Sequence, residues 1–356
     1  MKLPTLKIGN LIANIPIIQG GMGIGVSLSK LASAVANEGG IGVISAVQIG
    51  FREKDFEKNN KLANLRALAN EIRKAKELSP KGIIGVNILV AANDYAELVK
   101  TAVKEKIDII ISGAGIPKDL PKYVKGTDTK AVPIVSSGKA AALIAKLWKR
   151  RYDYLPDAII VEGPEAGGHL GFSNETLNKS PKPSLENIFK EVITAIKPFE
   201  YTYSKTIPVI AAGGIYSGKD IAKFINLGAA GVQMATRFVA TEECDAHINF
   251  KNAYVKAKEK DVKIIKSPVG MPGRAIKNAF VEKIEKINIP VRYCYNCLKT
   301  CNPATTPYCI SRALINAVEG NVENGLIFAG SNVGLVDKIT TVKELMSILV
   351  DEVEKI

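Results

Sequence analysis

Short runs of apolar and β-branched residues recur eight times in residues 1–240, and most of them end at glycine or a polar turn. Strands buried on both faces have continuous apolar sequences of this kind, because neither face meets water. The eight predicted strands are Ile15–Met22, Gly40–Ala46, Ile83–Leu89, Ile107–Ser112, Ala131–Ser136, Ala158–Glu162, Ile207–Ala212 and Gly231–Phe238. Helical periodicity lies between them, at Ser27–Asn37, Phe51–Leu78, Tyr95–Lys106, Lys139–Lys149, Leu185–Ile196 and Gly218–Leu227.

This alternation of strand and helix indicates an α/β fold. Eight such units match the (β/α)8 TIM barrel, whose usual size is ~250 residues. An open, doubly wound sheet is the competing fold, because alternation alone does not show whether the sheet closes. Such sheets often carry a G-x-G-x-x-G fingerprint, but the stretch Gly20–Gly25 lacks that spacing. The sequence therefore favours the barrel.

The alternation stops after Phe238, where helical patterns and a cysteine cluster follow. We predict three parts: a barrel in residues 1–240, a helical cap with the cysteine cluster in residues 241–320, and a return to the barrel in residues 321–356. The helices expected in the last two parts are Ala246–Lys260, Ala275–Ile287, Pro307–Val318 and Thr341–Val353.

Composition narrows the possible partners. The chain of 356 residues has a formal net charge of +13, which favours anionic partners such as phosphates, nucleotides, carboxylates or acidic carrier proteins. Aromatic residues make up only 6% and do not interleave with the basic run Lys146–Arg151, so nucleic-acid binding is not expected. The N-terminus has no secretory pattern and no apolar stretch approaches a membrane span, so we expect a cytoplasmic protein without a membrane partner.

Glycine-rich turns follow several predicted strands, at the end of the barrel where catalytic groups stand. Ala211–Ile215 and Met234–Arg237, after the last two strands, could direct backbone amides and the Thr236 hydroxyl at a phosphate, with help from the helix that begins near Ser217. Plain tight turns are the alternative explanation.

The chain has two histidines. His169 lies between glycines in the loop after the sixth strand, where its ring would face the barrel mouth and could exchange protons near neutral pH. His247 lies in the cap, and we expect a structural role for it.

At this point the motifs resemble those of a known family. The loop Gly163–Gly171, with the sequence GPEAGGHLG, is similar to the histidine loop of nitronate monooxygenases (2-nitropropane dioxygenases) and of the related flavin-dependent enoyl-ACP reductases. Further matches, in chain order, are Pro16–Gly23, Gly85–Asn87, Ile207–Ile215, Gly231–Phe238 and Gly273–Asn278.

The resemblance implies an oxidoreductase that binds FMN non-covalently, with His169 as the catalytic residue. The cofactor-binding residues that it and the loop positions indicate are Gly21, Met22, Asn87, Ser136, Glu162, Gly168, Gly213, Gly214, Gln233, Met234, Ala235 and Thr236.

The resemblance leaves two reactions open. As a nitronate monooxygenase, the protein would convert nitroalkanes or nitronates with O2 to a carbonyl compound and nitrite, with His169 deprotonating the nitroalkane as a base or positioning its nitronate. As an enoyl-thioester reductase, it would use NAD(P)H as co-substrate, and its basic surface would suit an acyl carrier protein. A non-enzymatic flavin- or metal-binding protein is a third hypothesis. The oligomeric state is open, with a homodimer as one expectation.

Two segments depart from the family pattern. A basic and aromatic insertion, Lys149–Pro156, precedes the sixth strand, and Ser331-Asn332 stands where many relatives have glutamine. We expect both to bear on the substrate more than on the flavin.

The cysteine cluster has the pattern C-x2-C-x3-C-x7-C. Four thiolates can complete a tetrahedral zinc site or hold an Fe–S cluster, whereas reduced or partly disulfide-linked thiols are the alternative. The candidate ligands are Cys294, Cys297, Cys301 and Cys309, and Cys244 is expected to be a lone buried thiol.

Overall fold

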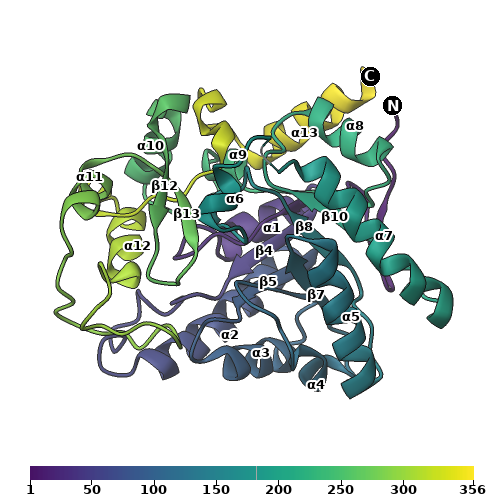
Figure 1. Ribbon diagram of the computed structural model, residues 1–356, viewed down its shortest axis with the longest axis horizontal. Helices are drawn as coiled ribbons and strands as arrows, with labels where there is room; N and C mark the ends of the chain where they lie inside the picture. The colour runs from purple at the N-terminus through teal and green to yellow at the C-terminus, as the bar shows by residue number, and fades with distance from the viewer. Residues whose placement is uncertain (182) are drawn as a thin grey trace.

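A computed structural model describes residues 1–181 and 183–356. Eight parallel strands form a closed barrel in the order β10-β11-β3-β4-β5-β6-β7-β8, which confirms the predicted fold (Figure 1). The strands are β3 (Ile17–Gln19), β4 (Ile41–Ser45), β5 (Ile83–Leu89), β6 (Ile109–Gly113), β7 (Lys130–Val135), β8 (Ile159–Glu162), β10 (Val209–Ala212) and β11 (Gly231–Met234).

Helices surround the barrel because each strand is apolar on both faces and its outer face packs against a helix. They are α1 (Ser29–Asn37), α2 (Asn60–Leu78), α3 (Tyr95–Lys104), α4 (Leu120–Val124), α5 (Gly138–Tyr152), α6 (Asn174–Leu177), α7 (Leu185–Tyr203), α8 (Gly218–Asn226) and α9 (Thr236–Val239). The last predicted run, Gly231–Phe238, is therefore strand only to Met234, and a short helix follows it.

An N-terminal hairpin closes one end of the barrel. Strands β1 (Leu6–Ile8) and β2 (Leu11–Ala13) pair antiparallel, and Leu6 and Ile8 pack in the same buried cluster as the barrel-interior residues Ile18 and Ile160. The opposite end, at the carboxyl ends of the strands, is left for a site. The sequence patterns had not indicated this hairpin.

The segment after the barrel is not purely helical, which corrects the prediction of a helical cap. It contains α10 (Ile248–Lys256), α11 (Ala279–Lys286) and α12 (Ile310–Val318), but also β12 (Val262–Lys266) and β13 (Pro272–Ile276). These strands join β9 (Gly168–His169) in an antiparallel sheet of order β12-β13-β9. Ala275 and Ile276 are therefore strand residues, because they pair with β12, and the helix predicted from Ala275 begins at Ala279.

Figure 1 shows α10, α11 and α12 with the β12–β13 hairpin gathered on one side of the barrel, whereas α8 and α13 (Val342–Glu354) lie on another. The chain ends meet there, because the Met1 amino group donates to the Val353 carbonyl. Short 3-10 turns complete the fold: η1 (Glu259–Asp261), η2 (Val322–Asn324) and η3 (Ser331–Leu335). In the described ranges, no helix has the length and apolar character needed to cross a bilayer. The three-part division of the chain stays a prediction.

Candidate active site

A cavity of about 250 Å³ opens at the carboxyl ends of the barrel strands. Every one of the eight strands, or the residues directly after it, contributes to the lining, for example Met22 after β3, Asn87 on β5 and Glu162 on β8. Parallel barrel strands present their carboxyl ends at a single face, so residues far apart in sequence converge there. The second part of the lining comes from the segment after residue 241.

The structure brings almost all predicted site residues to this cavity. Those that line it are Gly21, Met22, Asn87, Glu162, Gly168, His169, Gly213, Gly214, Gln233, Met234, Ala235 and Thr236. Ser136 is the exception: β7 ends at Val135 and Ser137 caps α5, so Ser136 lies in the intervening turn beside Gly171. Its assignment to the cofactor site stays a prediction.

Cavity-lining residues after β10 and β11 have backbone amides without acceptors. Gly213 and Gly214 have φ values of +89° and +86°, which favour glycine. Within the described part of the chain, the amides of Gly213, Gly214, Ala235 and Thr236 form no hydrogen bond. Unpaired backbone donors at a cavity wall indicate a site for an acceptor-rich ligand.

The start of α8 does not contribute donors, contrary to the prediction from sequence. Ser217 and Asp220 form a capping box, and Gly218 N–H donates to Glu352 of α13 at 2.6 Å. These partners occupy the amides of Ser217, Gly218 and Asp220. The two glycines and the turn after β11 remain as candidate donors for an anion.

Gln233 supplies a further unpaired group. Its Oε1 is buried and has no hydrogen-bond partner among the described residues. A buried acceptor without a donor is unfavourable, typically by about 1–3 kcal/mol. Together with the free amides, it indicates that this wall is shaped to bind a polar molecule.

Asn332 and Thr236 fix the loops on this side. Asn332 Nδ2 donates to the Gly214 carbonyl at 2.8 Å, and Gly330 N–H donates to Thr236 Oγ1 at 3.2 Å. The Ser331-Asn332 departure from the family pattern thus supports the glycine turn after β10. The insertion Lys149–Pro156 precedes β8 and therefore lies at the opposite, amino-terminal end of the barrel strands.

His169 is partly buried at the cavity wall. Its Nε2 lies 2.8 Å from Ser267 Oγ, and its ring packs edge-on against Phe328 with centroids 4.9 Å apart. Burial lowers the pKa of His169 to about 4, because the charged imidazolium loses hydration. The imidazole is therefore neutral near pH 7.

A buried arginine braces the histidine loop. Arg274 on β13 donates from Nη1 to the carbonyls of Pro164 at 2.6 Å and Ala166 at 2.5 Å. Gly273 and Arg274 also pair with His169 and Gly168 across the antiparallel sheet. The β12–β13 hairpin therefore sets where His169 stands.

Glu162, at the carboxyl end of β8, is a titratable residue of the cavity lining. Burial raises the pKa of its carboxyl to about 7, because ionisation in this setting is not compensated by hydration. Glu162 is thus substantially protonated below pH 7 and can donate a hydrogen bond to a ligand there.

The outer wall of the cavity was not predicted from sequence. Its apolar members come from α10, the hairpin turn, the cysteine segment (residues 294–301) and α12: Phe250, Tyr254, Val269, Cys297, Leu298, Ile310, Leu314 and Phe328, the last of which precedes η3. Ser267, the partner of His169, was also missed. No motif distinguishes these residues, because long-range packing brings them to the site.

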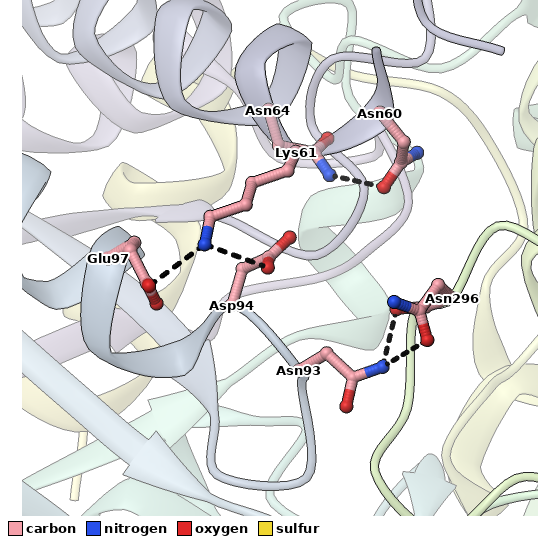
Figure 2. Close-up of polar contacts among 7 residues, drawn as sticks. All are labelled: Asn60, Lys61, Asn64, Asn93, Asp94, Glu97 and Asn296. Carbon is pink, nitrogen blue, oxygen red and sulfur yellow. Dashed lines mark hydrogen bonds and ion pairs between the residues drawn. The ribbon is translucent and has the colours of Figure 1, made fainter. Parts of the chain in front are cut away.

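The cysteine segment is held against the loop after β5. Asn93 Nδ2 donates to both the carbonyl and Oδ1 of Asn296, at 2.6 and 2.8 Å (Figure 2). Asn93 N–H donates to the Cys297 carbonyl, and Ala92 forms an antiparallel bridge with Leu298. Cys297 and Leu298 consequently line the cavity.

The predicted metal site at the four cysteines is not confirmed. In residues 1–181 and 183–356, no three His, Cys, Asp or Glu side chains form a group that could hold a metal ion. All five cysteines are free thiols. Cys294 is exposed, whereas Cys297, Cys301 and Cys309 are half-buried, and Cys297 lines the cavity. Cys244 is buried, as expected.

His247 has the structural role that we expected. Its Nδ1 accepts a hydrogen bond from Asn249 N–H at 3.1 Å and so caps α10.

A barrel with a cavity at the carboxyl ends of all eight strands is the arrangement typical of a (β/α)8 enzyme. The profile of the family described as "Nitronate monooxygenase" matches residues 5–352, so the chain belongs to that family of oxidoreductases.

Known relatives have different activities. A 5-hydroxy-7a-methyl-1-oxo-octahydro-1H-indene-4-carboxyl-CoA dehydrogenase of Rhodococcus jostii is 27% identical, over 96% of this chain and 93% of the relative. A probable nitronate monooxygenase of Staphylococcus aureus is 26% identical, over 76% and 78%. The structure of FabK from Thermotoga maritima matches with a TM-score of 0.71 and 28% identity, over 96% of this chain and 93% of that one.

Proposed function

We propose that this protein is an FMN-dependent nitronate monooxygenase, which oxidises alkyl nitronates with O2 to a carbonyl compound and nitrite. The observation that carries the proposal is that His169, the unpaired backbone donors after β10 and β11, and the unpaired acceptor of Gln233 line a single cavity. Family membership supports the same assignment.

The residues present fit FMN. The amides of Gly213, Gly214, Ala235 and Thr236 would bind its phosphate, and Gln233 Oε1 would accept from a ribityl hydroxyl or a ring N–H. A Cβ on Gly21 would come within 2.4 Å of Asn87 Cβ, so only glycine lets the turn after β3 pack against Asn87. Met22 and Asn87, which line the cavity, would border the flavin. The bound flavin would supply the acceptor for the electrons of the substrate.

The chain's own groups would position the substrate and limit water. His169, neutral at pH 7 and held by Ser267, would contact the nitro group of the substrate, as a base or as a hydrogen-bond partner. The apolar outer wall, including Val269 and Leu298, would cover the alkyl part and keep water from the reacting atoms.

The test is anaerobic mixing of the FMN-loaded protein with an alkyl nitronate and, separately, with NAD(P)H. We expect the nitronate alone to bleach the flavin absorbance. His169→Ala should retain FMN and lose at least about tenfold in nitronate turnover, whereas His247→Gln should retain both. A protein that cannot be reconstituted with FMN would contradict the proposal.

The second candidate is an NAD(P)H-dependent enoyl-thioester reductase. It is favoured by the similarity to FabK and to an enzyme named for a coenzyme A ester. In that case NAD(P)H would bleach the flavin and an enoyl thioester would restore it, with an acyl carrier protein or coenzyme A as the carrier. Bleaching by NAD(P)H without bleaching by nitronate would select this function.

A further inference from the structure

The two ring nitrogens of His169 differ in their surroundings. Nε2 lies 2.8 Å from Ser267 Oγ, whereas Nδ1 forms no hydrogen bond with any residue that the structure describes. Ser267 follows β12 and its side chain is buried. Its Oγ also accepts a hydrogen bond from Val269 N–H at 3.3 Å. Nδ1 is therefore the nitrogen left for a ligand.

The proton on the Ser267–His169 contact can be placed by counting donors and acceptors. A hydroxyl has one hydrogen to donate and two lone pairs that accept. Val269 N–H already occupies one lone pair, and in residues 1–181 and 183–356 the Ser267 hydroxyl has no acceptor other than His169 Nε2. If Nε2 carried the proton, Oγ would accept twice and its own O–H would be buried without a partner, which is unfavourable.

We propose that Ser267 donates to Nε2 and so holds His169 as the Nδ1–H tautomer, which presents a hydrogen-bond donor, not a lone pair, to the substrate. The proposal rests on the proposed function and refines it: the protein takes the nitronate anion, whose oxygen accepts from Nδ1–H, in preference to the neutral nitroalkane, which requires a base. Ser267 is then a positioning residue for His169.

The chemistry of the cavity is consistent with this role. An imidazole with a pKa of about 4 is a weak base toward the far less acidic C–H of a nitroalkane. No Lys or Arg is among the described residues that line the cavity, so neutral donors must bind the anionic oxygen. A donor fixed in place before the substrate arrives stabilises negative charge most effectively where water is excluded.

The tautomer can be measured directly because the chain has only two histidines. In ¹⁵N-histidine-labelled protein at pH 7, protonated and unprotonated ring nitrogens give widely separated shifts. His247 is an internal reference, because its Nδ1 accepts from Asn249 N–H and its proton must therefore be on Nε2; His247→Gln assigns the signals. We expect His169 to carry its proton on Nδ1. A proton on Nε2 of His169 would overturn the inference.

Steady-state kinetics tests the expected preference for the nitronate over the neutral nitroalkane. We expect kcat/KM for an alkyl nitronate to exceed that for the neutral nitroalkane at least 100-fold in the native protein. His169→Asn, which keeps an N–H donor but has no basic nitrogen, should lose much less nitronate turnover than His169→Ala. Ser267→Ala should lower nitronate turnover roughly tenfold and allow both His169 tautomers to appear, because the hydroxyl that selects between them is gone. Ser267→Thr should restore the tautomer and the turnover.

Ser33→Ala is the matched control, since Ser33 is also buried but lies in α1 and donates only to the Lys30 carbonyl. Comparable turnover of nitroalkane and nitronate, with loss of nitroalkane turnover in His169→Asn, would show that His169 is a base and refute the inference. If the FMN-loaded protein oxidises neither compound, the proposed function fails, whereas the NMR measurement still decides the tautomer.

Discussion

The two walls of the cavity are built in different ways. The inner wall consists of the turns directly after the barrel strands, where glycines leave amides free, as at Gly213 and Gly214. The outer wall consists of the β12–β13 hairpin, the cysteine segment and α12, joined to the barrel through contacts such as Asn93–Asn296 and Arg274–Pro164. We infer that the inner wall serves the cofactor and that the outer wall serves the substrate.

A small change in the inner wall should weaken flavin binding strongly. In Gly213→Ala, the new Cβ would lie 3.0 Å from the Gly163 carbonyl oxygen at a φ of +89°. Displacing this turn removes charge-assisted hydrogen bonds to the phosphate, so we expect FMN affinity to fall at least about 100-fold. Flavin fluorescence titration measures it.

The control for this variant is Gly126→Ala. Gly126 has a similar φ of +85°, but its Cβ would meet nothing within 4 Å. Both variants should be destabilised by roughly 1–2 kcal/mol for the left-handed conformation. Unchanged FMN affinity in Gly213→Ala would remove this turn from the cofactor site.

The stability of the protein should depend on pH through Glu162, which lines the cavity. The pKa of Glu162 is raised from 4.5 to about 7 in the folded protein, so the unfolded chain releases this proton at a lower pH than the folded one does. Its neutral form therefore stabilises the fold fully below pH 4.5, and this contribution is lost as the pH rises through 7.

Glu162→Gln cannot ionise. In the flavin-free protein, we expect its unfolding free energy to match the native value near pH 4.5 and to exceed it by on the order of 1–3 kcal/mol at pH 8.5. Urea unfolding at both pH values is the measurement. A difference that does not depend on pH would contradict the raised pKa.

Substitution of two barrel glutamines, buried Gln19 and half-buried Gln233, should change stability with opposite signs. Gln233 Oε1 has no partner, so Gln233→Leu should stabilise the flavin-free protein by about 1 kcal/mol and weaken FMN binding roughly tenfold. Gln19 is fully paired: its Nε2 donates to the Gly20 and Val43 carbonyls and its Oε1 accepts from Val43 N–H. Gln19→Leu should therefore destabilise the protein. Destabilisation by both substitutions would show that Gln233 is not held ready for a ligand.

The difference between the inner and outer walls also explains which parts of the site could be predicted from the sequence. The eight barrel strands and the glycine turns follow from local pattern, since burial on both faces and positive φ each leave a signature at the residue itself. The pairing of β13 with β9 joins Gly273 to His169 across more than 100 residues, and the exposed Ile264 obscures the strand pattern of β12. Ser267 is placed by that pairing, so no local motif indicates it.

The smallest effect is expected where the outer wall joins the barrel. Asn93→Ala removes the two side-chain hydrogen bonds to Asn296 but leaves the backbone bond to Cys297, so the wall should loosen without detaching. We expect a loss of about 1 kcal/mol in stability and a two- to threefold rise in KM for the nitronate, with kcat and FMN affinity unchanged.

Lys61→Ala is the matched control in the same region, because Lys61 pairs with Glu97 and Asp94 within the barrel helices and does not touch the cysteine segment (Figure 2). That exposed ion pair is screened by solvent, so its removal should leave both stability and KM unchanged. If Asn93→Ala lowered FMN affinity while KM for the nitronate stayed constant, the outer wall would serve the cofactor, and the division of labour between the two walls would be wrong.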